Sequence, residues 1–191
     1  MVYIFENLSL CTSQWLKERE KTLPAWRQNK VQAYKKEEDK IRSVAAFLLL
    51  ARVLQDRGVA PVPEFAYEAW GKPYLPGCPI HFSLSHCEKA VVCAVSDVPV
   101  GVDAQDEMEF SSKLADRICS EEERASLAAA KDPGKALTAL WTKKEALAKC
   151  SGKGLGERFS SLEGEVFTLH RPGYCVSVTE ENPRICILNE L

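Results

Sequence analysis

The segment HFSLSHCEKAVVCAVSDVPVGVD, residues 81–103, carries the clearest strand signal in the chain. Its first five residues alternate in polarity, and Ala90–Val95 is a short apolar run rich in valine. Asp97–Pro99 interrupts the apolar pattern, which resumes at Val100–Asp103. Alternation and short β-branched runs between turn residues are typical of antiparallel strands. We therefore predict two or three antiparallel strands joined by tight turns.

A helix is predicted upstream, over Asp39–Gln55. Its apolar residues recur at the i, i+3, i+4 and i+7 positions of one helical face, namely Ile41, Val44, Ala45, Leu48 and Ala51. Gly58, Pro61 and Pro63 mark the loop beyond it. The preceding run Arg27–Lys40 is dense in both signs of charge, which is typical of a solvated helix face.

The second half of the sequence repeats the order of helix and then strands. Ser120–Glu123 (SEEE) has the pattern of a capping box, and Asp132–Pro133 opens a longer helix to about Cys150. Three glycines end that helix: Gly152, Gly154 and Gly156. Strands are expected at Glu165–Leu169, Cys175–Thr179 and Ile185–Leu188. The order predicts an α+β fold of two similar α/β lobes, each a helix packed on a small antiparallel sheet, divided into residues 1–103 and 104–191.

The composition excludes several classes of protein. Hydrophobic residues make up 46% and charged residues 27%, which excludes a disordered or collagen-like chain. The net charge of −2 argues against a general nucleic-acid binder, because such proteins need a surplus of cations. The longest apolar run, Val44–Ala51, is too short to span a bilayer. The opening MVYIFENLSL lacks the pattern of a secretory signal, so we expect a cytoplasmic protein without membrane partners.

The eight cysteines are interpreted as reduced, mostly buried small hydrophobes. No two form a C-x-x-C pair, and there are only three histidines. The closely spaced ligands of a zinc site are therefore missing.

The segment WTKKEALAK, Trp141–Lys149, is the strongest candidate for chemistry. On a helix, Glu145 and Lys149 lie one turn apart on one face, together with Trp141. A glutamate four residues before a lysine is also a common surface ion pair. The tryptophan on the same face favours a functional interpretation.

Three weaker motifs precede it. In VGVD, Asp103 follows a short apolar strand, although an aspartate there can also simply open a turn. In FSLSH, Ser85 and His86 end an alternating strand. In GKP, Gly71 allows close backbone approach, with Lys72 and Pro73 beside it.

Taken in order, GKP, FSLSH, VGVD and WTKKEALAK resemble the motif series of the 4′-phosphopantetheinyl transferases of the two-lobed, surfactin-synthetase type. The resemblance implies an active site between two pseudo-symmetric lobes. It also implies a Mg²⁺-dependent transfer of the phosphopantetheine arm of coenzyme A to a serine of an apo acyl or peptidyl carrier protein, releasing adenosine 3′,5′-bisphosphate. We expect a monomer, because one chain would supply both sides of the cleft.

The resemblance also implies roles for individual residues. Asp103 and Glu145 would bind the metal, Glu145 would also accept the serine proton, and Lys149 would hold the phosphate that gains charge. Lys144 would have a supporting role. Coenzyme A would be contacted by a further set, namely Arg27, Lys30, Arg42, Lys72, Pro73, Ser85 and His86. Lys35, Lys36 and Lys40 match no motif position and remain part of a solvated face.

One position departs from the family pattern. Gln105 stands where the family often has an acidic third metal ligand, and an amide oxygen coordinates Mg²⁺ without adding charge. This leaves open a coenzyme A- or nucleotide-binding protein of the same fold without transferase activity. The remaining alternative is a structural or interaction module, in which these polar residues lie on the surface and have no chemical role.

Overall fold

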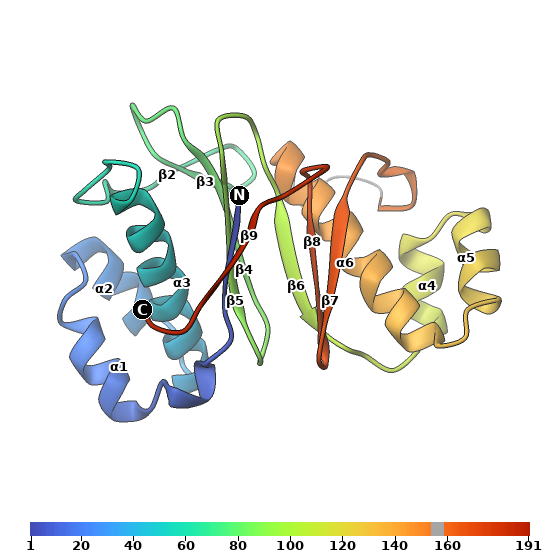
Figure 1. Cartoon of the computed structure of the whole chain (residues 1–191), viewed down its shortest axis with the longest axis horizontal. Helices are drawn as coiled ribbons and strands as arrows, with labels where there is room; N and C mark the ends of the chain where they lie inside the picture. Colours follow the sequence, from blue (N-terminus) through green and yellow to red (C-terminus); the bar gives the residue numbers. More distant parts are fainter. Residues whose placement is uncertain (154–158) are drawn as a thin grey trace.

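The computed structural model describes residues 1–153 and 159–191 and has a mixed α+β fold (Figure 1). Its helices are α1 (Ser13–Glu20), α2 (Ala25–Gln32), α3 (Glu37–Gln55), α4 (Ser112–Ile118), α5 (Glu121–Ala128) and α6 (Pro133–Ser151), with short 3₁₀ turns η1 (Leu8–Leu10) and η3 (Phe159–Ser161). Its strands are β1 (Val2–Phe5), β2 (Ala66–Tyr67), β3 (Pro73–Tyr74), β4 (His81–His86), β5 (Val91–Ser96), β6 (Val102–Asp106), β7 (Phe167–Arg171), β8 (Tyr174–Val178) and β9 (Ile185–Leu188).

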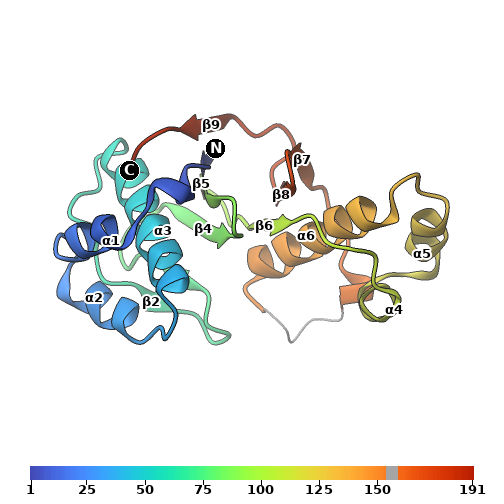
Figure 2. The ribbon, with the colours of Figure 1, turned by 90° about the horizontal axis from the view of Figure 1, so that it is seen from below.

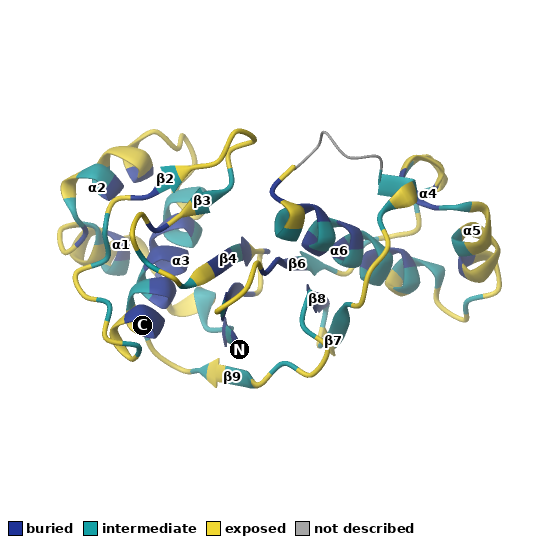
Figure 3. Ribbon diagram, turned by 90° about the horizontal axis from the view of Figure 1, so that it is seen from above, coloured by how far each residue is buried: buried dark blue, intermediate teal, exposed yellow. Residues whose placement is uncertain are grey.

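Helix α3 covers one face of a four-stranded sheet with the order β4-β5-β1-β9. Because side chains alternate along a strand, Val91, Cys93 and Val95 of β5 point toward α3. There they join a core with Val44, Leu50 and other apolar residues of the helix. Figure 3 shows the buried face of α3 turned toward the sheet, while much of α1 and α2 stays exposed.

The opposite face of β5 packs against the second sheet, which has the order β6-β8-β7. Val92 of β5 meets Val102 of β6 and Val176 of β8 in one buried cluster. The alternate residues of β6, Asp103 and Gln105, therefore face the other side of this sheet, where α6 packs. This alternation directs polar side chains of β6 toward the helix that carries the WTKKEALAK segment.

Strand β9 differs from the prediction in its partner. Ile185–Leu188 was expected in the second half, but it runs parallel to β1 in the first sheet, with Val2 opposite Ile185. The chain crosses back over the molecule to reach this edge (Figure 2). The first sheet is therefore mixed rather than wholly antiparallel, and the boundary after Asp103 falls inside β6. The division into residues 1–103 and 104–191 stays a prediction.

The predicted ends of the later helices are confirmed. Ser120 and Glu123 form a complete capping box on α5, and the Asp132 side chain caps α6 by accepting from the Lys135 amide. Helix α6 ends at Gly152, whose φ of 73° is the left-handed conformation that glycine adopts readily. Gly154 and Gly156 lie outside the described residues. The predictions omitted α1, α4, β1 and the small hairpin β2–β3.

Two sequence-level expectations concern sulfur and membranes. All eight cysteines are free, five of them buried, as expected for reduced residues. Among the described residues, no helix combines the length and the apolar character needed to cross a bilayer.

Candidate active site

A cleft with a volume of about 460 Å³ collects most of the residues singled out in the sequence. Asp103 and Gln105 enter it from β6, Ser85 and His86 from β4, and Glu145 and Lys149 from α6. Its wall is completed by residues of the first half and by the α6 tryptophan, namely Arg27, Lys30, Tyr34, Ser43, Phe65, Pro73 and Trp141. Four motifs that are far apart in sequence thus meet at one place.

The centre of the cleft is a compact hydrogen-bonded cluster of Asp103, Lys149 and Ser85. Lys149 Nζ lies 2.7 Å from Asp103 Oδ1 and 3.0 Å from Ser85 Oγ. Ser85 Oγ donates to the same Asp103 oxygen at 2.8 Å and accepts from the Ala104 amide at 3.1 Å. A hydroxyl has one donor and two acceptor positions, so these contacts use the full capacity of Ser85. Ser85 therefore fixes the Asp103 carboxylate in this structure.

Gly101 is the local reason that β6 can bring Asp103 so close to α6. A Cβ atom on Gly101 would lie 1.9 Å from Ala146 O and 2.5 Å from Cys150 N, both backbone atoms of α6. Only a residue without a side chain allows this approach. The glycine of the VGVD motif is thus explained by the packing of the strand against the helix.

Glu145 lies one turn before Lys149 and is partly buried in the cleft wall. Loss of hydration on burial raises the pKa of Glu145, and the charge of Asp103 raises it further. Lys149 and Arg117 oppose this shift. The two carboxylates thus repel each other, and Lys149 pairs directly with only one of them, Asp103.

Arg27 is a buried cation in the opposite wall, not part of a solvated face. Its side chain is stacked over Phe47, and its Nη2 atom donates to the carbonyl and hydroxyl oxygens of Ser43 at 2.8 and 2.7 Å. Its Nε atom is buried without a hydrogen-bond partner. Burial lowers the pKa of Arg27, although a guanidinium remains charged. Lys30 is exposed beside it and contacts the Tyr67 hydroxyl at 3.0 Å.

His86 lines the cleft, whereas Arg42 does not. Arg42 forms an ion pair with Asp39 at 2.6 Å. His86 is exposed to solvent, but neighbouring parts of the chain reduce the hydration of its ring, and this loss of hydration lowers the pKa of His86. The nearby charges of Arg42 and Lys149 lower that pKa further. A neutral imidazole is therefore favoured at His86.

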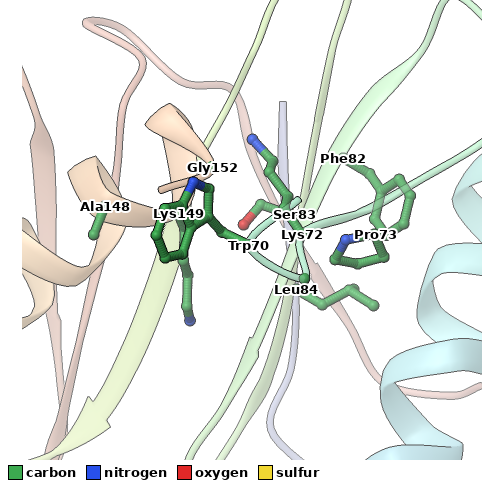
Figure 4. A pocket seen from close by; sticks show the side chains of 10 residues that line it. Trp70, Lys72, Pro73, Phe82, Ser83, Leu84, Ala148, Lys149 and Gly152 are labelled. Carbon is green, nitrogen blue, oxygen red and sulfur yellow. The ribbon is translucent and has the colours of Figure 1, made fainter. Parts of the chain in front are cut away.

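Lys72 lines a second, more apolar cavity of about 240 Å³, which shares Pro73, Leu84 and Lys149 with the cleft. This cavity lies between the β2–β3 hairpin and the end of α6 (Figure 4). Lys72 Nζ donates to Val100 O at 3.3 Å and to Cys150 O at 3.0 Å. Because Cys150 O is near the carboxyl end of α6, the cation also complements the helix dipole.

Lys144 does not reach the cleft. Its side chain is 1% exposed and its Nζ pairs with Glu123 Oε1 at 2.8 Å, on the side of α6 that meets α5. It also donates to Leu162 O at 3.0 Å. Lys144 therefore connects α6 to α5 and to the segment at Leu162 inside the protein.

Several residues that contact the lining of the cleft carry no signal in the sequence. Phe159 stacks on Trp141 with ring centroids 5.7 Å apart and an interplanar angle of 4°, and the Arg117 guanidinium lies 5.7 Å from the same indole ring. Tyr67, on the β2–β3 hairpin, is the partner of Lys30. These contacts join elements that are distant along the chain, so no local pattern could indicate them.

Comparisons with known proteins point to one family. Residues 99–190 match the family model described as the 4′-phosphopantetheinyl transferase superfamily. The chain is 32% identical over 127 residues to a 4′-phosphopantetheinyl transferase of Bacillus subtilis, covering 64% of this chain and 56% of that protein. It is 34% identical over 123 residues to the transferase gsp of Aneurinibacillus migulanus, covering 61% and 51%. It is 33% identical over 114 residues to the transferase Sfp of Bacillus subtilis strain 168, covering 58% and 49%.

The matches thus span about half the length of these curated relatives. A solved structure of holo-[acyl-carrier-protein] synthase from Thermotoga maritima aligns at 22% identity with a TM-score of 0.37, covering 42% of this chain and 61% of that one. The matched region contains the whole of VGVD and the whole WTKKEALAK segment. Through residues 99–190, this chain is similar to the 4′-phosphopantetheinyl transferase superfamily.

Proposed function

We propose that the chain transfers the 4′-phosphopantetheine arm of coenzyme A to a serine of an acyl or peptidyl carrier protein, releasing adenosine 3′,5′-bisphosphate. The observation that carries this proposal is the composition of the cleft. Cations from the first half face Asp103, Glu145 and Lys149 across a space of about 460 Å³. Phosphoryl transfer depends mainly on positioning and charge stabilisation, and these groups supply both.

Coenzyme A brings three phosphate groups, and Arg27 and Lys30 are the proposed contacts for the one on the ribose. A buried guanidinium with an unpartnered Nε favours a nearby anion, because a phosphate would compensate its charge. Lys30 adds a second, exposed cation. His86, which lines the cleft, and Arg42, which does not, are proposed as weaker contacts, while Pro73 contributes an apolar surface of the cleft. The ammonium of Lys72 is hydrogen-bonded to Val100 O and Cys150 O. We therefore propose that Lys72 affects nucleotide binding indirectly, by holding the β2–β3 hairpin in place.

In the proposed reaction, the carrier serine oxygen attacks the phosphorus that bears the pantetheine arm. The bond from that phosphorus to the bridging oxygen breaks, and the bridging oxygen leaves with adenosine 3′,5′-bisphosphate. Glu145 accepts the serine proton, a role that its raised pKa suits because the carboxylate becomes a stronger base. Lys149 stabilises the charge that develops on the phosphate, and Ser85 keeps Asp103 in place.

The donor set fits a divalent cation. Asp103 and Glu145 supply two carboxylates, their repulsion contributes to the raised pKa of Glu145, and Gln105 adds an amide oxygen in the same cleft. Hard oxygen donors of this kind suit Mg²⁺, which would neutralise charge on the pyrophosphate when bound. No group of three His, Cys, Asp or Glu side chains suited to a metal occurs among the described residues, so the proposed third ligand is the neutral Gln105.

The arrangement of the two halves is also part of the proposal. Helices α3 and α6 are each 19 residues long, and each covers one sheet. We infer that residues 1–103 and 104–191 are two related lobes, apart from the returning strand β9, with the active site between them. A single chain then supplies both walls of the cleft, which supports a monomer.

The test is incubation of the protein with coenzyme A, Mg²⁺ and several apo carrier proteins, followed by intact-mass measurement of each carrier. The expected result is a gain of one phosphopantetheine group on at least one carrier. A carrier variant with the acceptor serine replaced by alanine is the control and should gain nothing. Binding of coenzyme A without transfer to any carrier would refute the proposal in favour of a coenzyme A-binding protein. Failure to bind coenzyme A would refute both.

A further inference from the structure

Lys144 is the largest fully buried side chain of the described residues, with 1% of its surface exposed. An ammonium group in such a place is costly unless it is paired and hydrogen-bonded. Both requirements are met, by Glu123 Oε1 at 2.8 Å and Leu162 O at 3.0 Å. The proposed reaction does not use this group, so its burial needs another explanation.

The Glu123 carboxylate connects the ammonium to the start of α5. Its other oxygen, Oε2, accepts from the Ser120 amide at 2.8 Å and completes the capping box. One carboxylate thus binds the helix end and Lys144 at the same time. Lys144 thereby joins α6, the first turn of α5 and the segment at Leu162, which are separate along the chain.

The segment held at Leu162 also carries Phe159, whose ring stacks on Trp141. Trp141 lies on α6 one turn before Glu145, and both line the cleft. Lys144 points to the other side of the same helix, away from the cleft. The contacts therefore run from Lys144 through Leu162 and Phe159 to Trp141.

Resting on the proposed transferase function, we propose that Lys144 is a positioning residue for the reaction. Its bonds to Glu123 and Leu162 hold Phe159 against Trp141 and so fix the cleft wall that contains Trp141 and Glu145. It touches neither substrate nor reacting atoms. Its loss should disturb the chemical step more than coenzyme A binding, because Arg27 and Lys30 lie on the opposite wall.

The test compares Lys144→Met with Lys144→Arg and with Lys143→Met, a neighbouring lysine that is partly exposed and serves as the matched control. Hydrogen exchange measured by mass spectrometry should show increased uptake over residues 159–166 in Lys144→Met, but not over residues 37–55. The kcat for carrier modification should fall about 10- to 100-fold, while the dissociation constant for coenzyme A changes less than about threefold. Lys144→Arg should retain more of the kcat than Lys144→Met, and Lys143→Met should resemble the wild type.

Unchanged exchange over residues 159–166 would overturn the anchoring role. Increased exchange with an unchanged kcat per folded molecule would overturn the link to the reaction. If Lys144→Met does not fold, Glu123→Gln replaces it, since glutamine can keep the capping bond while removing the negative partner. Absence of transfer by the wild type would refute the proposed function instead, and the exchange measurement would still decide the anchoring role.

Discussion

Replacement of Gly101 by alanine tests whether the close approach of β6 to α6 assembles the site. The added Cβ would begin 1.9 Å from Ala146 O, whereas ordinary contact starts near 3.4 Å. Neither that oxygen nor the nearby Cys150 N can rotate away, because both belong to the helix backbone. The strand and the helix must therefore separate by more than 1 Å, at the upper end of the usual cost of overpacking, about 3 kcal/mol. The 2.7 Å contact between Asp103 and Lys149 lies on this interface and should be lost.

Unfolding in urea, followed by tryptophan fluorescence, measures the stability change of Gly101→Ala, and the carrier-modification assay measures its activity. We expect transfer to fall about 100-fold or more at a temperature where the variant remains folded. Gly134→Ala is the matched control, because its Cβ would also meet a backbone oxygen, Met108 O at 2.6 Å, but near the start of α6. It should lose stability with a much smaller loss of activity. A Gly101→Ala protein within about 0.5 kcal/mol of the wild type and fully active would refute the packing argument.

Three further predictions follow from the charges. Glu145→Gln should abolish most of the transfer activity, and near wild-type turnover would contradict the assignment of the site. Its urea midpoint at neutral pH should be equal to that of the wild type or higher, because the raised pKa of Glu145 means that the ionised carboxylate is less stable in the folded protein than in the unfolded chain. Dephospho-coenzyme A should bind more weakly than coenzyme A, by about 1–3 kcal/mol in calorimetry, and equal affinities would rule out the role given to Arg27. Hydrogen bonds from Arg171 and Tyr174 lower the pKa of Glu6 in the folded protein. The ionised Glu6 side chain therefore stabilises the fold at pH values above its unfolded pKa near 4.5, and this stabilisation disappears as the pH falls through its pKa in the folded protein. Glu6→Gln should therefore lower the urea midpoint at neutral pH and lose that effect in acid, and a pH-independent difference would be evidence against this.

Much of the fold could be predicted because its signals are local. The apolar periodicity of residues 39–55 lies within α3, and the alternation of residues 81–86 is that of β4. Capping residues gave the starts of α5 and α6, since each cap bonds a backbone group only three residues away. The four ordered motifs predicted a shared site, and the structure places residues of each motif in one cleft with Asp103.

The remainder depends on contacts between distant parts of the chain. Strand β9 was predicted in extent, but its pairing with β1 joins residues about 180 positions apart and leaves no local pattern. Arg27 was expected as a cation that contacts coenzyme A, but no local pattern indicated that tertiary packing buries it against Phe47 and Ser43. The ammonium of Lys72 was expected at the ligand, but in the structure it bonds carbonyl oxygens of two other elements. A sequence motif indicates that such a residue matters without saying what it touches.

The hydrogen-bonded cluster at the centre of the cleft explains how one chain can hold several charges in so small a space. Lys149 shares Oδ1 of Asp103 with Ser85, and Ser85 is in turn fixed by the Ala104 amide of the same strand that carries Asp103. The Asp103 charge is therefore compensated within the chain, whereas Glu145 is more weakly compensated and has a raised pKa. A phosphate entering the cleft must compete with Asp103 for Lys149, so binding of the anion and release of Asp103 are coupled. In the proposed reaction the same lysine would both stabilise the folded cleft and become available to the phosphate, and both roles require the close approach of β6 and α6 that Gly101 permits.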